Sequence, residues 1–394
     1  MERLRIKNIR SIIDSGDIAI NRVNILLGQN STGKSSFLNI FPMFKETTKN
    51  ELRSPLMWFG EGTYDFGAFN IARCRYAKKG EPIVFEFAWK SLQKKKDSRC
   101  EDCTMYERSQ LGIMNALNYR ISFSVNSDKH GDYFEEVVLK GDDHTVKVKC
   151  SKTRSLSFYL DELEIISKPA SWDYGVQGIL PNVRFKGKYS PYNNIRRVIN
   201  SIIPEGYHEP LKNVDYLRLY NIKSIEPVDI YSYYEKNRAE NPFMDFILKA
   251  HKSDSKEFRD FCNDIYLSVI ISSLVYADKY LSSSFEETSY MLPVRYAFGR
   301  YIRNKNLSVE DISPSGENVM EYLLSLSNKE LDDFNIFLYN VLHITVSVMG
   351  DENKSIYIQT KNGKDNIVDV GYGFTQILPI ATMLWNNARK KSHC

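Results

Sequence analysis

Hydrophobic and polar residues alternate along the first part of the chain over lengths typical of β-strands. Residues 3–8, 16–20 and 23–27 alternate or run apolar over such lengths, and residues 37–45 follow with helical spacing. Between residues 83 and 166, short alternating segments recur with turn residues between them. This rhythm predicts an antiparallel meander, because alternating βα units would place helical segments between the strands.

The second half of the chain changes to helical spacing, with apolar residues three and four positions apart. Helices are predicted at residues 195–203, 243–280, 319–326, 332–342 and 374–389. The segments "HITVSVM" and "SIYIQTK" alternate instead and predict a hairpin, and residues 290–294 have strand character. Strands and helices together predict an α/β fold class.

The composition is ordinary for a globular protein, with 42% hydrophobic and 26% charged residues. The net charge of +4 is too small to indicate a nucleic-acid partner by itself. The longest weakly polar run, residues 265–277, is shorter than the ~20 residues that a membrane span needs. The N-terminus has no apolar signal and the cysteines are scattered, so we expect a cytoplasmic protein with reduced thiols and no membrane partner.

The segment "GQNSTGKSS" carries the strongest chemical signal, because it fits the phosphate-binding pattern G-x-x-x-x-G-K-[ST]. A predicted strand, residues 23–27, leads into it, and the predicted helix at residues 37–45 leads out of it. A phosphate-binding loop, or P-loop, occupies this position between a strand and a helix. The predicted nucleotide-binding residues are Gly28, Gln29, Asn30, Ser31, Thr32, Gly33, Lys34, Ser35 and Ser36.

The residue types in this loop suit the triphosphate of a nucleotide. Glycines let backbone N–H groups turn toward phosphate oxygens, and the positive end of the following helix points at the same charge. Lys34 is expected to reach the β- and γ-phosphates of ATP, and the Ser35 hydroxyl to ligate the Mg²⁺ ion that bridges them. The predicted cofactors are therefore ATP and Mg²⁺.

Five segments, taken in their order along the chain, resemble the motifs of one group of P-loop proteins. They are "GQNSTGKSS", "YDFGAFNIA", "YMLPVR", "PSGENVMEYLL" and "DVGYGFTQILPI". In type and order they resemble ABC-type AAA ATPases of the RecF/SMC/OLD-like group, most closely the bacterial anti-phage branch with Septu-type and retron-associated ATPases. The resemblance is strong over residues 1–90 and 285–394 and weak through the middle of the chain.

The resemblance implies that "DVGYGFTQ" corresponds to the signature region of this family. Two heads of such ATPases meet face to face, so that the P-loop of one and the signature of the other close on the same ATP. Gly371 and Gly373 would let backbone amides approach the γ-phosphate, with Thr375 and Gln376 beside them. The residues alone leave another explanation open, in which the glycines serve a strand-to-helix turn that needs a positive φ.

The implied architecture is an α/β P-loop NTPase head of the ABC type, with an antiparallel β subdomain and a helical insertion. Its expected divisions are residues 1–95 with the P-loop, 96–190 rich in strands, 191–284 as the insertion, and 285–394 with the signature. The expected function is ATP-dependent dimerisation coupled to a DNA-linked process, namely anti-phage defence or DNA maintenance. The family implies a second head, an effector nuclease and nucleic acid as partners.

Hydrolysis in this family needs a carboxylate pair on a strand after the signature helix, and no such strand follows residue 389, so catalytic residues are not assigned. Three explanations stay open: the chain is a fragment, a second polypeptide supplies the strand, or ATP is bound without turnover. Without this strand, we expect the P-loop strand to leave apolar surface uncovered. The chain as given is therefore predicted to aggregate or to depend on a partner.

Two further acidic and thiol motifs are weaker candidates. Asp161 and Glu162 in "SFYLDE" imitate the acidic motif of such ATPases, but they precede the signature and also fit a turn between strands. Cys100 and Cys103 form one CxxC pair, whereas a zinc site usually has a second pair. Arg295, at the end of "YMLPVR", fits either a nucleotide contact or a core ion pair.

Three clusters of cations are weaker candidates for contact with a nucleic-acid backbone. Solvated loops have the same composition, so both interpretations stay open. The clusters are residues 94–96 with Arg99; Lys147, Lys149, Lys152 and Arg154; and Arg184, Lys186, Lys188, Arg196 and Arg197.

Two other functions remain alternatives to the ATPase head. A P-loop kinase for a small molecule or a nucleic-acid end would need an arginine-bearing lid and an acidic base, and the sequence shows no clear lid. A non-hydrolysing scaffold would use ATP for assembly alone. Transfer of the γ-phosphate to an acceptor would identify the kinase, and ATP-dependent dimerisation without phosphate release would identify the scaffold.

Overall fold

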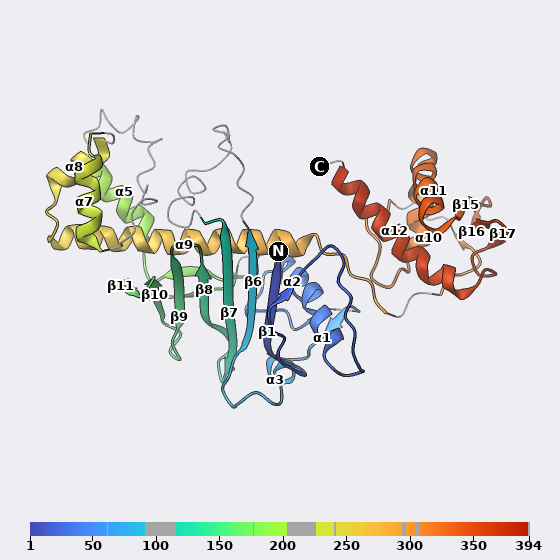
Figure 1. Ribbon diagram of the computed structural model, residues 1–394, viewed down its shortest axis with the longest axis horizontal. Helices are drawn as coiled ribbons and strands as arrows, with labels where there is room; N and C mark the ends of the chain where they lie inside the picture. The colour runs from blue at the N-terminus through green and yellow to red at the C-terminus, as the bar shows by residue number, and fades with distance from the viewer. Residues whose placement is uncertain are drawn as a thin grey trace. The chain divides into compact units, whose positions relative to one another are not determined.

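A computed structural model describes residues 1–60, 62–90, 116–175, 177–202, 226–239, 242–293, 297–303 and 308–392 (Figure 1). The chain forms two compact units. Unit 1 consists of Met1–Gly60 with Tyr64–Thr288, and unit 2 of Glu61–Thr63 with Ser289–Cys394. The P-loop segment therefore lies in unit 1 and the signature-like segment in unit 2.

A nine-stranded antiparallel sheet forms the framework of unit 1, in the order β11-β10-β9-β8-β7-β6-β1-β2, with β3 also pairing with β1. The strands are β1 (Arg3–Ile9), β2 (Ile12–Asp14), β3 (Ile18–Ala19), β6 (Ile83–Lys90), β7 (Asn118–Asp128), β8 (Gly131–Lys140), β9 (Thr145–Cys150), β10 (Leu156–Leu160) and β11 (Leu163–Ile165). Each strand from β6 to β11 pairs with the next along the chain, which confirms the predicted meander.

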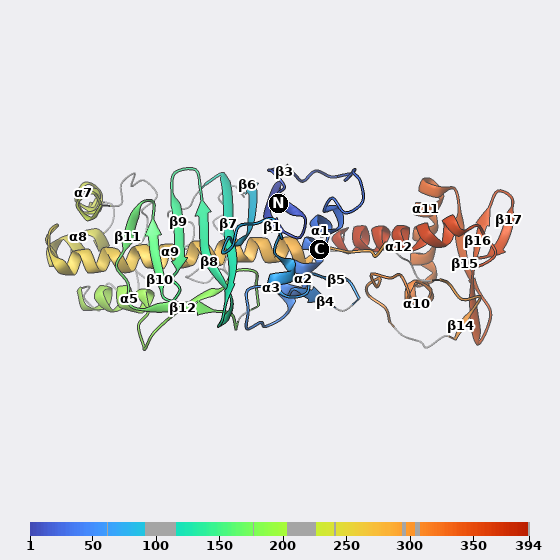
Figure 2. The ribbon, with the colours of Figure 1, turned by 90° about the horizontal axis from the view of Figure 1, so that it is seen from below.

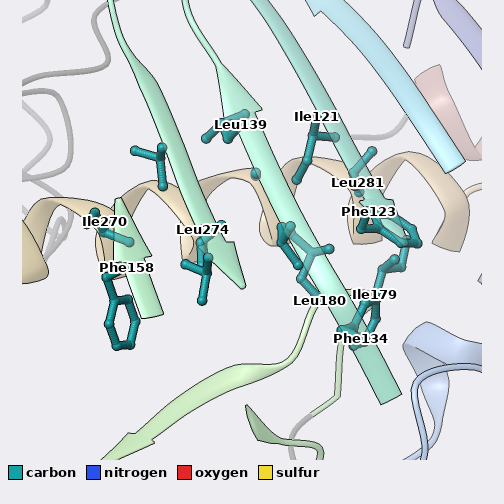
Figure 3. Close-up of a cluster of buried hydrophobic side chains, with 14 of the residues drawn as sticks. Ile121, Phe123, Phe134, Leu139, Phe158, Ile179, Leu180, Ile270, Leu274 and Leu281 are labelled. Carbon is teal, nitrogen blue, oxygen red and sulfur yellow. The ribbon is translucent and has the colours of Figure 1, made fainter. Parts of the chain in front are cut away.

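One face of this sheet is buried because apolar residues occupy every second position of its strands. In β6 the buried positions run from Ile83 to Trp89, and the residues between them are partly exposed. The buried face packs on α9 (Lys256–Glu286), a helix of 31 residues that runs across the strands (Figures 1 and 3). Figure 3 shows Leu274 of α9 together with side chains of the strands that it packs against.

Shorter helices and strands complete unit 1. Two helices, α1 (Lys34–Leu38) and α2 (Ile40–Lys49), follow the P-loop and are separated by Asn39. The remaining elements are β4 (Phe59–Gly60), β5 (Tyr64–Asp65), α3 (Phe69–Ala72), β12 (Ala170–Asp173), β13 (Asn182–Phe185), α5 (Pro191–Ile202), α7 (Pro227–Asn237) and α8 (Pro242–Ala250).

The single helix predicted at residues 243–280 is divided into α8 and α9. The side chain of Ser255 accepts a hydrogen bond from the N–H of Phe258 at 3.2 Å and caps the start of α9. Serine is among the best N-cap residues because its hydroxyl satisfies a backbone donor that has no partner within the helix. This serine is the sequence signal for the break.

The described part of unit 2 combines a small antiparallel sheet with the three helices α10, α11 and α12. Its elements are β14 (Ile302–Arg303), α10 (Val319–Ser325), α11 (Asn328–Leu342), β15 (Thr345–Met349), β16 (Asn353–Thr360), β17 (Gly363–Asn366) and α12 (Tyr372–Ser392). The predicted hairpin is confirmed, since β15 and β16 pair antiparallel. The rings of Phe334 and Trp385, 5.1 Å apart, pack α11 against α12 in a core separate from that of unit 1.

The described elements form a mixed α/β structure with antiparallel sheets, in agreement with the predicted class. Two predicted strands are wrong: residues 23–27 and the described residues 290–293 belong to no strand. An extended segment needs a neighbouring strand to satisfy its backbone, and the described residues provide none beside 23–27. Within the same described residues, no helix is long and apolar enough to cross a membrane.

Candidate nucleotide-binding site

The predicted P-loop turns sharply before it enters α1. Ser31 has a left-handed φ of 63°, and Gly33, the N-cap of α1, has a φ of 99°. Lys34 is the first residue of the helix, and Ser35 beside it is exposed. This geometry lets the Lys34 side chain fold back over the loop, where a bound phosphate would lie between the lysine and the backbone.

The Lys34 ammonium group is held by carbonyl groups of its own loop. Its Nζ donates to the carbonyl of Gly28 at 2.8 Å and also to the carbonyl of Gln29. The Thr32 hydroxyl donates to the same Gln29 carbonyl at 2.9 Å. Phosphate oxygens are acceptors of the same kind, so a nucleotide would replace these carbonyls as the partner of the ammonium group.

The turn between β1 and β2 forms one wall of the loop. A Cβ atom placed on Gly33 would lie 2.8 Å from Cγ1 of Ile12 and 3.0 Å from Oγ of Ser11. Glycine is therefore required at this position for two reasons: its φ is positive, and the neighbouring turn leaves no room for a Cβ atom. Sequence reasoning missed Ser11 and Ile12 as positioning residues, because no motif marks them and only the hairpin places them against the loop.

A cluster of aromatic rings supports the helices behind the P-loop. The ring of Phe41 lies 6.2 Å from Phe37 of α1 and 6.0 Å from Phe285 near the end of α9. The ring of Phe44 lies 4.9 Å from the same Phe285. These contacts pack α1 and α2 against α9, so the helices that follow the P-loop belong to the core of unit 1.

The segment leading into the P-loop exposes its apolar side chains. Val23, Ile25 and Leu27 are 77%, 76% and 87% exposed, at alternating positions, while Leu26 between them is half-buried. Alternation is the pattern of a strand with one covered face. In the described residues nothing covers that face, so the predicted uncovered apolar surface beside the P-loop is present.

The signature-like segment forms the start of α12 and is open to solvent. Tyr372 is 75% exposed, between the exposed Gly371 and Gly373. Neither glycine has a positive φ, and a Cβ atom on either would meet nothing within 4 Å. The alternative explanation, a turn that needs glycine for its φ, is therefore contradicted.

Polar groups near this start are already engaged within unit 2. The Thr375 hydroxyl donates to the carbonyl of Tyr372 at 2.8 Å, so its proton is used within the start of the helix. The guanidinium group of Arg300 donates to both oxygens of Asp369 at 2.8 and 2.6 Å and holds the pKa of that carboxyl below its usual range. Gln376 begins the second turn of α12 and is half-buried.

Three of the five sequence motifs meet in unit 2. The N–H of Leu292, in "YMLPVR", donates to the carbonyl of Pro314 at 2.8 Å. Gly316 of the next motif packs on Pro379 of α12, so closely that a Cβ atom would lie 3.0 Å from the proline Cβ. The motifs are thus divided by unit: "GQNSTGKSS" belongs to unit 1, and these three segments form one packed group in unit 2.

The acidic motif in "SFYLDE" has a structural role. Asp161 begins the turn between β10 and β11, and its carboxylate accepts the N–H of Thr145 at 2.8 Å and contacts Nδ1 of His144 at 2.9 Å. These bonds tie this turn to the start of β9. The interpretation of Asp161 and Glu162 as a turn is confirmed, which leaves no role for them at the P-loop.

The remaining candidates are distributed without a common site. The first cation cluster, residues 94–96 with Arg99, lies outside the described residues, as do Cys100, Cys103 and Arg295. Among the residues that are described, no three His, Cys, Asp or Glu side chains lie together so as to hold a metal ion. Cys150 is buried, and burial raises the pKa of its thiol. A Mg²⁺ ion would therefore depend on Ser35 and on the phosphates themselves for ligands.

A scan against models of known protein families gave no match to this chain, and a search of curated proteins gave none either.

Proposed function

We propose that this chain is an ATP-binding head of the ABC type that works in pairs. The observation that carries the proposal is the contrast between two segments. One is a loop that holds Lys34 with its own carbonyls, and the other is a helix start whose glycines have neither a positive φ nor a close neighbour among the described residues. In the proposed complex, the P-loop of one copy and the start of α12 of a second copy close on one ATP. Gly371 and Gly373 leave the space that this approach requires.

Each loop residue would have a separate role in binding the nucleotide. Lys34 would exchange the carbonyls of Gly28 and Gln29 for phosphate oxygens, and Ser35 would ligate Mg²⁺ together with those phosphates. Ser11 and Ile12 would hold Gly33 in the left-handed turn. Mg²⁺, when bound, neutralises the charge that develops on the phosphates during transfer.

Hydrolysis would require carboxylates that the described site does not contain. A strand paired with residues 23–27 would satisfy their backbone groups, and the resembled family carries its carboxylates on such a strand. We therefore propose that the complete site includes this strand. Phosphate release measured alongside ATP binding separates a hydrolase from the non-hydrolysing scaffold.

The wider role follows from the resemblance alone. We propose a DNA-linked process of bacteria, most specifically anti-phage defence, in which closure of the two heads changes the position of the middle part of the chain. An effector nuclease is the proposed partner protein.

Substitution of Lys34 tests the proposal directly. Lys34→Ala should lower the affinity for ATP roughly 10- to 150-fold, which corresponds to about 1.5–3 kcal/mol for the loss of a charged hydrogen-bond donor. Binding of a fluorescent ATP analogue measures this effect. Lys49→Ala is the matched control, because it removes the same charge from an exposed position at the end of α2. Equal affinity of Lys34→Ala and the wild type would overturn the proposal.

A further inference from the structure

A stretch of the middle region has basic residues and no acidic ones. Between Asp173 and Glu205 the sequence contains five Arg and Lys residues and no Asp or Glu, although 49 of the 394 residues of the chain are acidic. The five are named here the basic patch: Arg184, Lys186, Lys188, Arg196 and Arg197. The local charge is therefore much higher than the net charge of the whole chain indicates.

The structure directs the first three of these cations to the surface. Phe185 stacks on Phe158 of β10 at 6.0 Å, and its ring also contacts Tyr189 at 4.9 Å. The Tyr189 hydroxyl donates to the carboxylate of Asp264 on α9. Phe185 and Tyr189 are partly buried, whereas their neighbours Arg184, Lys186 and Lys188 are exposed. The cations consequently point away from the core to which their neighbours are fixed.

The helix α5 continues this basic surface. Its buried Ile195 packs into the core, whereas Arg196 and Arg197 are exposed. Figure 2 shows α5 and α7 on opposite sides of α9. Asn193 and Asn200 are also exposed on α5, so the outer face of this helix consists of cations and amides. Both groups donate hydrogen bonds to phosphate oxygens.

The two described cation clusters both use part of their charge in salt bridges within the protein. In the second cluster Arg154 bonds to Asp128 at 2.7 Å, and Lys149 lies 3.5 Å from Glu136. In the basic patch Arg184 pairs with Asp173 at 3.0 Å, but its side chain remains 71% exposed. Within the described residues, no salt bridge involves Lys186, Lys188 or Arg196. These charges remain available to an external anion.

The surroundings of the basic patch favour nucleic acid over an acidic protein. Protein interfaces are anchored by large apolar or aromatic side chains that become buried at their centre. Among the described residues, no large apolar side chain is prominently exposed between Ile166 and Val228. A surface of cations and amides without such an anchor suits a phosphodiester backbone, which offers charge and acceptors but no apolar pocket.

We infer that the basic patch is a second binding site, which takes the phosphodiester backbone of a nucleic acid. This inference deepens the DNA-linked part of the proposed function and rests on it for the class of partner. The contacts are made to phosphates, so the site binds without sequence preference. Its affinity should decrease steeply with salt, because each neutralised phosphate releases a bound counterion.

Fluorescence anisotropy with labelled random-sequence DNA, double- and single-stranded, measures this site. Five phosphate contacts predict that the affinity for duplex falls roughly 10²- to 10³-fold between about 50 and 200 mM salt. Charge reversal at two positions, Arg196→Glu with Arg197→Glu, should lower the affinity at low salt roughly 10- to 100-fold. It should also reduce the salt slope by about 2. The two strand forms distinguish duplex from single-strand binding.

The matched control is Lys78→Glu with Lys79→Glu, which reverses two adjacent exposed charges elsewhere in unit 1. Equal loss in this control would mean that only net charge matters and would overturn the inference, as would unchanged binding by the Arg196/Arg197 variant. Displacement of the DNA by polyglutamate or anionic vesicles as effectively as by unlabelled DNA would show a different class of partner. Lys34→Ala should keep its DNA affinity, so failure of the ATP proposal and failure of this site give different results.

Discussion

Gly33 in unit 1 and Gly373 in unit 2 are both glycines of candidate nucleotide contacts, yet their surroundings in the fold differ. Gly33 has a φ of 99°, and a Cβ atom there would collide with the side chain of Ile12. Gly373 lies in the first turn of α12, has no positive φ, and is surrounded by open space. The first glycine is required by the fold, and the second is not.

This difference separates two meanings of a glycine in a sequence motif. A glycine inside a helix costs about 1 kcal/mol relative to alanine, because it loses more backbone entropy on folding. This cost does not apply to Gly33, because it is the N-cap that precedes α1 and its left-handed φ favours glycine. Gly373 lies in the first turn of α12, and within the described residues a Cβ atom there would meet nothing within 4 Å, so no close contact explains the glycine.

Gly178 of unit 1 is another glycine that the fold requires, although it belongs to none of the sequence motifs. A Cβ atom there would lie 3.0 Å from Cγ of Asp278 and even closer to one of its oxygens. The Asp278 carboxylate accepts the N–H groups of Ile179 and Leu180, each at 2.7 Å. A buried carboxylate thus fixes this loop on α9, and glycine allows the approach.

The largest effect is expected from Gly33→Ala. Its left-handed backbone costs about 1–2 kcal/mol for a residue with a Cβ, and the collision with Ile12 adds about 1–3 kcal/mol. The free energy of unfolding of unit 1 should therefore fall by about 2–5 kcal/mol, and the protein should lose ATP binding. Thermal unfolding and nucleotide titration measure the two effects.

Gly16→Ala is the control for Gly33→Ala, because Gly16 has a φ of 66° and open space around it. It should show only the cost of the backbone conformation, about 1–2 kcal/mol. If both variants lose the same stability, the contact with Ile12 has no energetic weight and the role of the β1–β2 turn is refuted.

A second prediction concerns pH and the loop fixed by Asp278. Burial raises the pKa of Asp278 to about 6 from its ordinary value near 3.8, because the charged form loses water. Between these values the folded state binds more protons than the unfolded state. The contribution of Asp278 to stability should therefore decrease by roughly 3 kcal/mol as pH rises from about 4 to about 6 and remain low above that range.

Asp278→Asn removes the titration and keeps an oxygen that accepts the two N–H groups. The difference in free energy of unfolding between wild type and variant should change with pH between about 4 and 6, as the raised pKa requires. Urea unfolding at a series of pH values measures this difference. A difference that stays constant across the series would mean that the carboxyl has its ordinary pKa.

The sheet and most helices of this protein could be predicted because local alternation decides them. The meander from β6 to β11 has clean period-two burial, and α11 begins with a capping box at Ser327 and Glu330. Residues 23–27 show the same alternation but form no strand, because strand formation depends on a partner that local sequence does not report. The break before α9 was missed although Ser255 signals it.

The candidate site could be predicted as a list of loop residues but not as an arrangement. The motif names Gly33 and Lys34, whereas the packing of Ile12 on Gly33 depends on a hairpin turn that carries no motif. The purpose of Gly371 and Gly373 was ambiguous in the sequence, because a turn and an external contact require the same residue. Their φ values are properties of the folded chain, and these contradict the turn explanation.

The smallest change in stability, with a selective change in assembly, is expected from Gly373→Ala. The added Cβ meets no atom within 4 Å and improves helix propensity, so the free energy of unfolding should rise by up to about 1 kcal/mol. ATP binding to the P-loop should remain, since Lys34 is untouched. ATP-dependent dimerisation should weaken, because the methyl group occupies the space that the partner nucleotide would enter. Thermal unfolding and light scattering with and without ATP measure these effects.

Ala388→Gly is the converse control, because Ala388 is an exposed position on the same helix. It should lower the free energy of unfolding by about 1 kcal/mol and leave assembly unchanged. If Gly373→Ala dimerises with ATP as the wild type does, the glycine has no external role and α12 is an ordinary helix start. If it is destabilised instead, the open space around Gly373 is filled in the folded protein, and the contrast with Gly33 disappears.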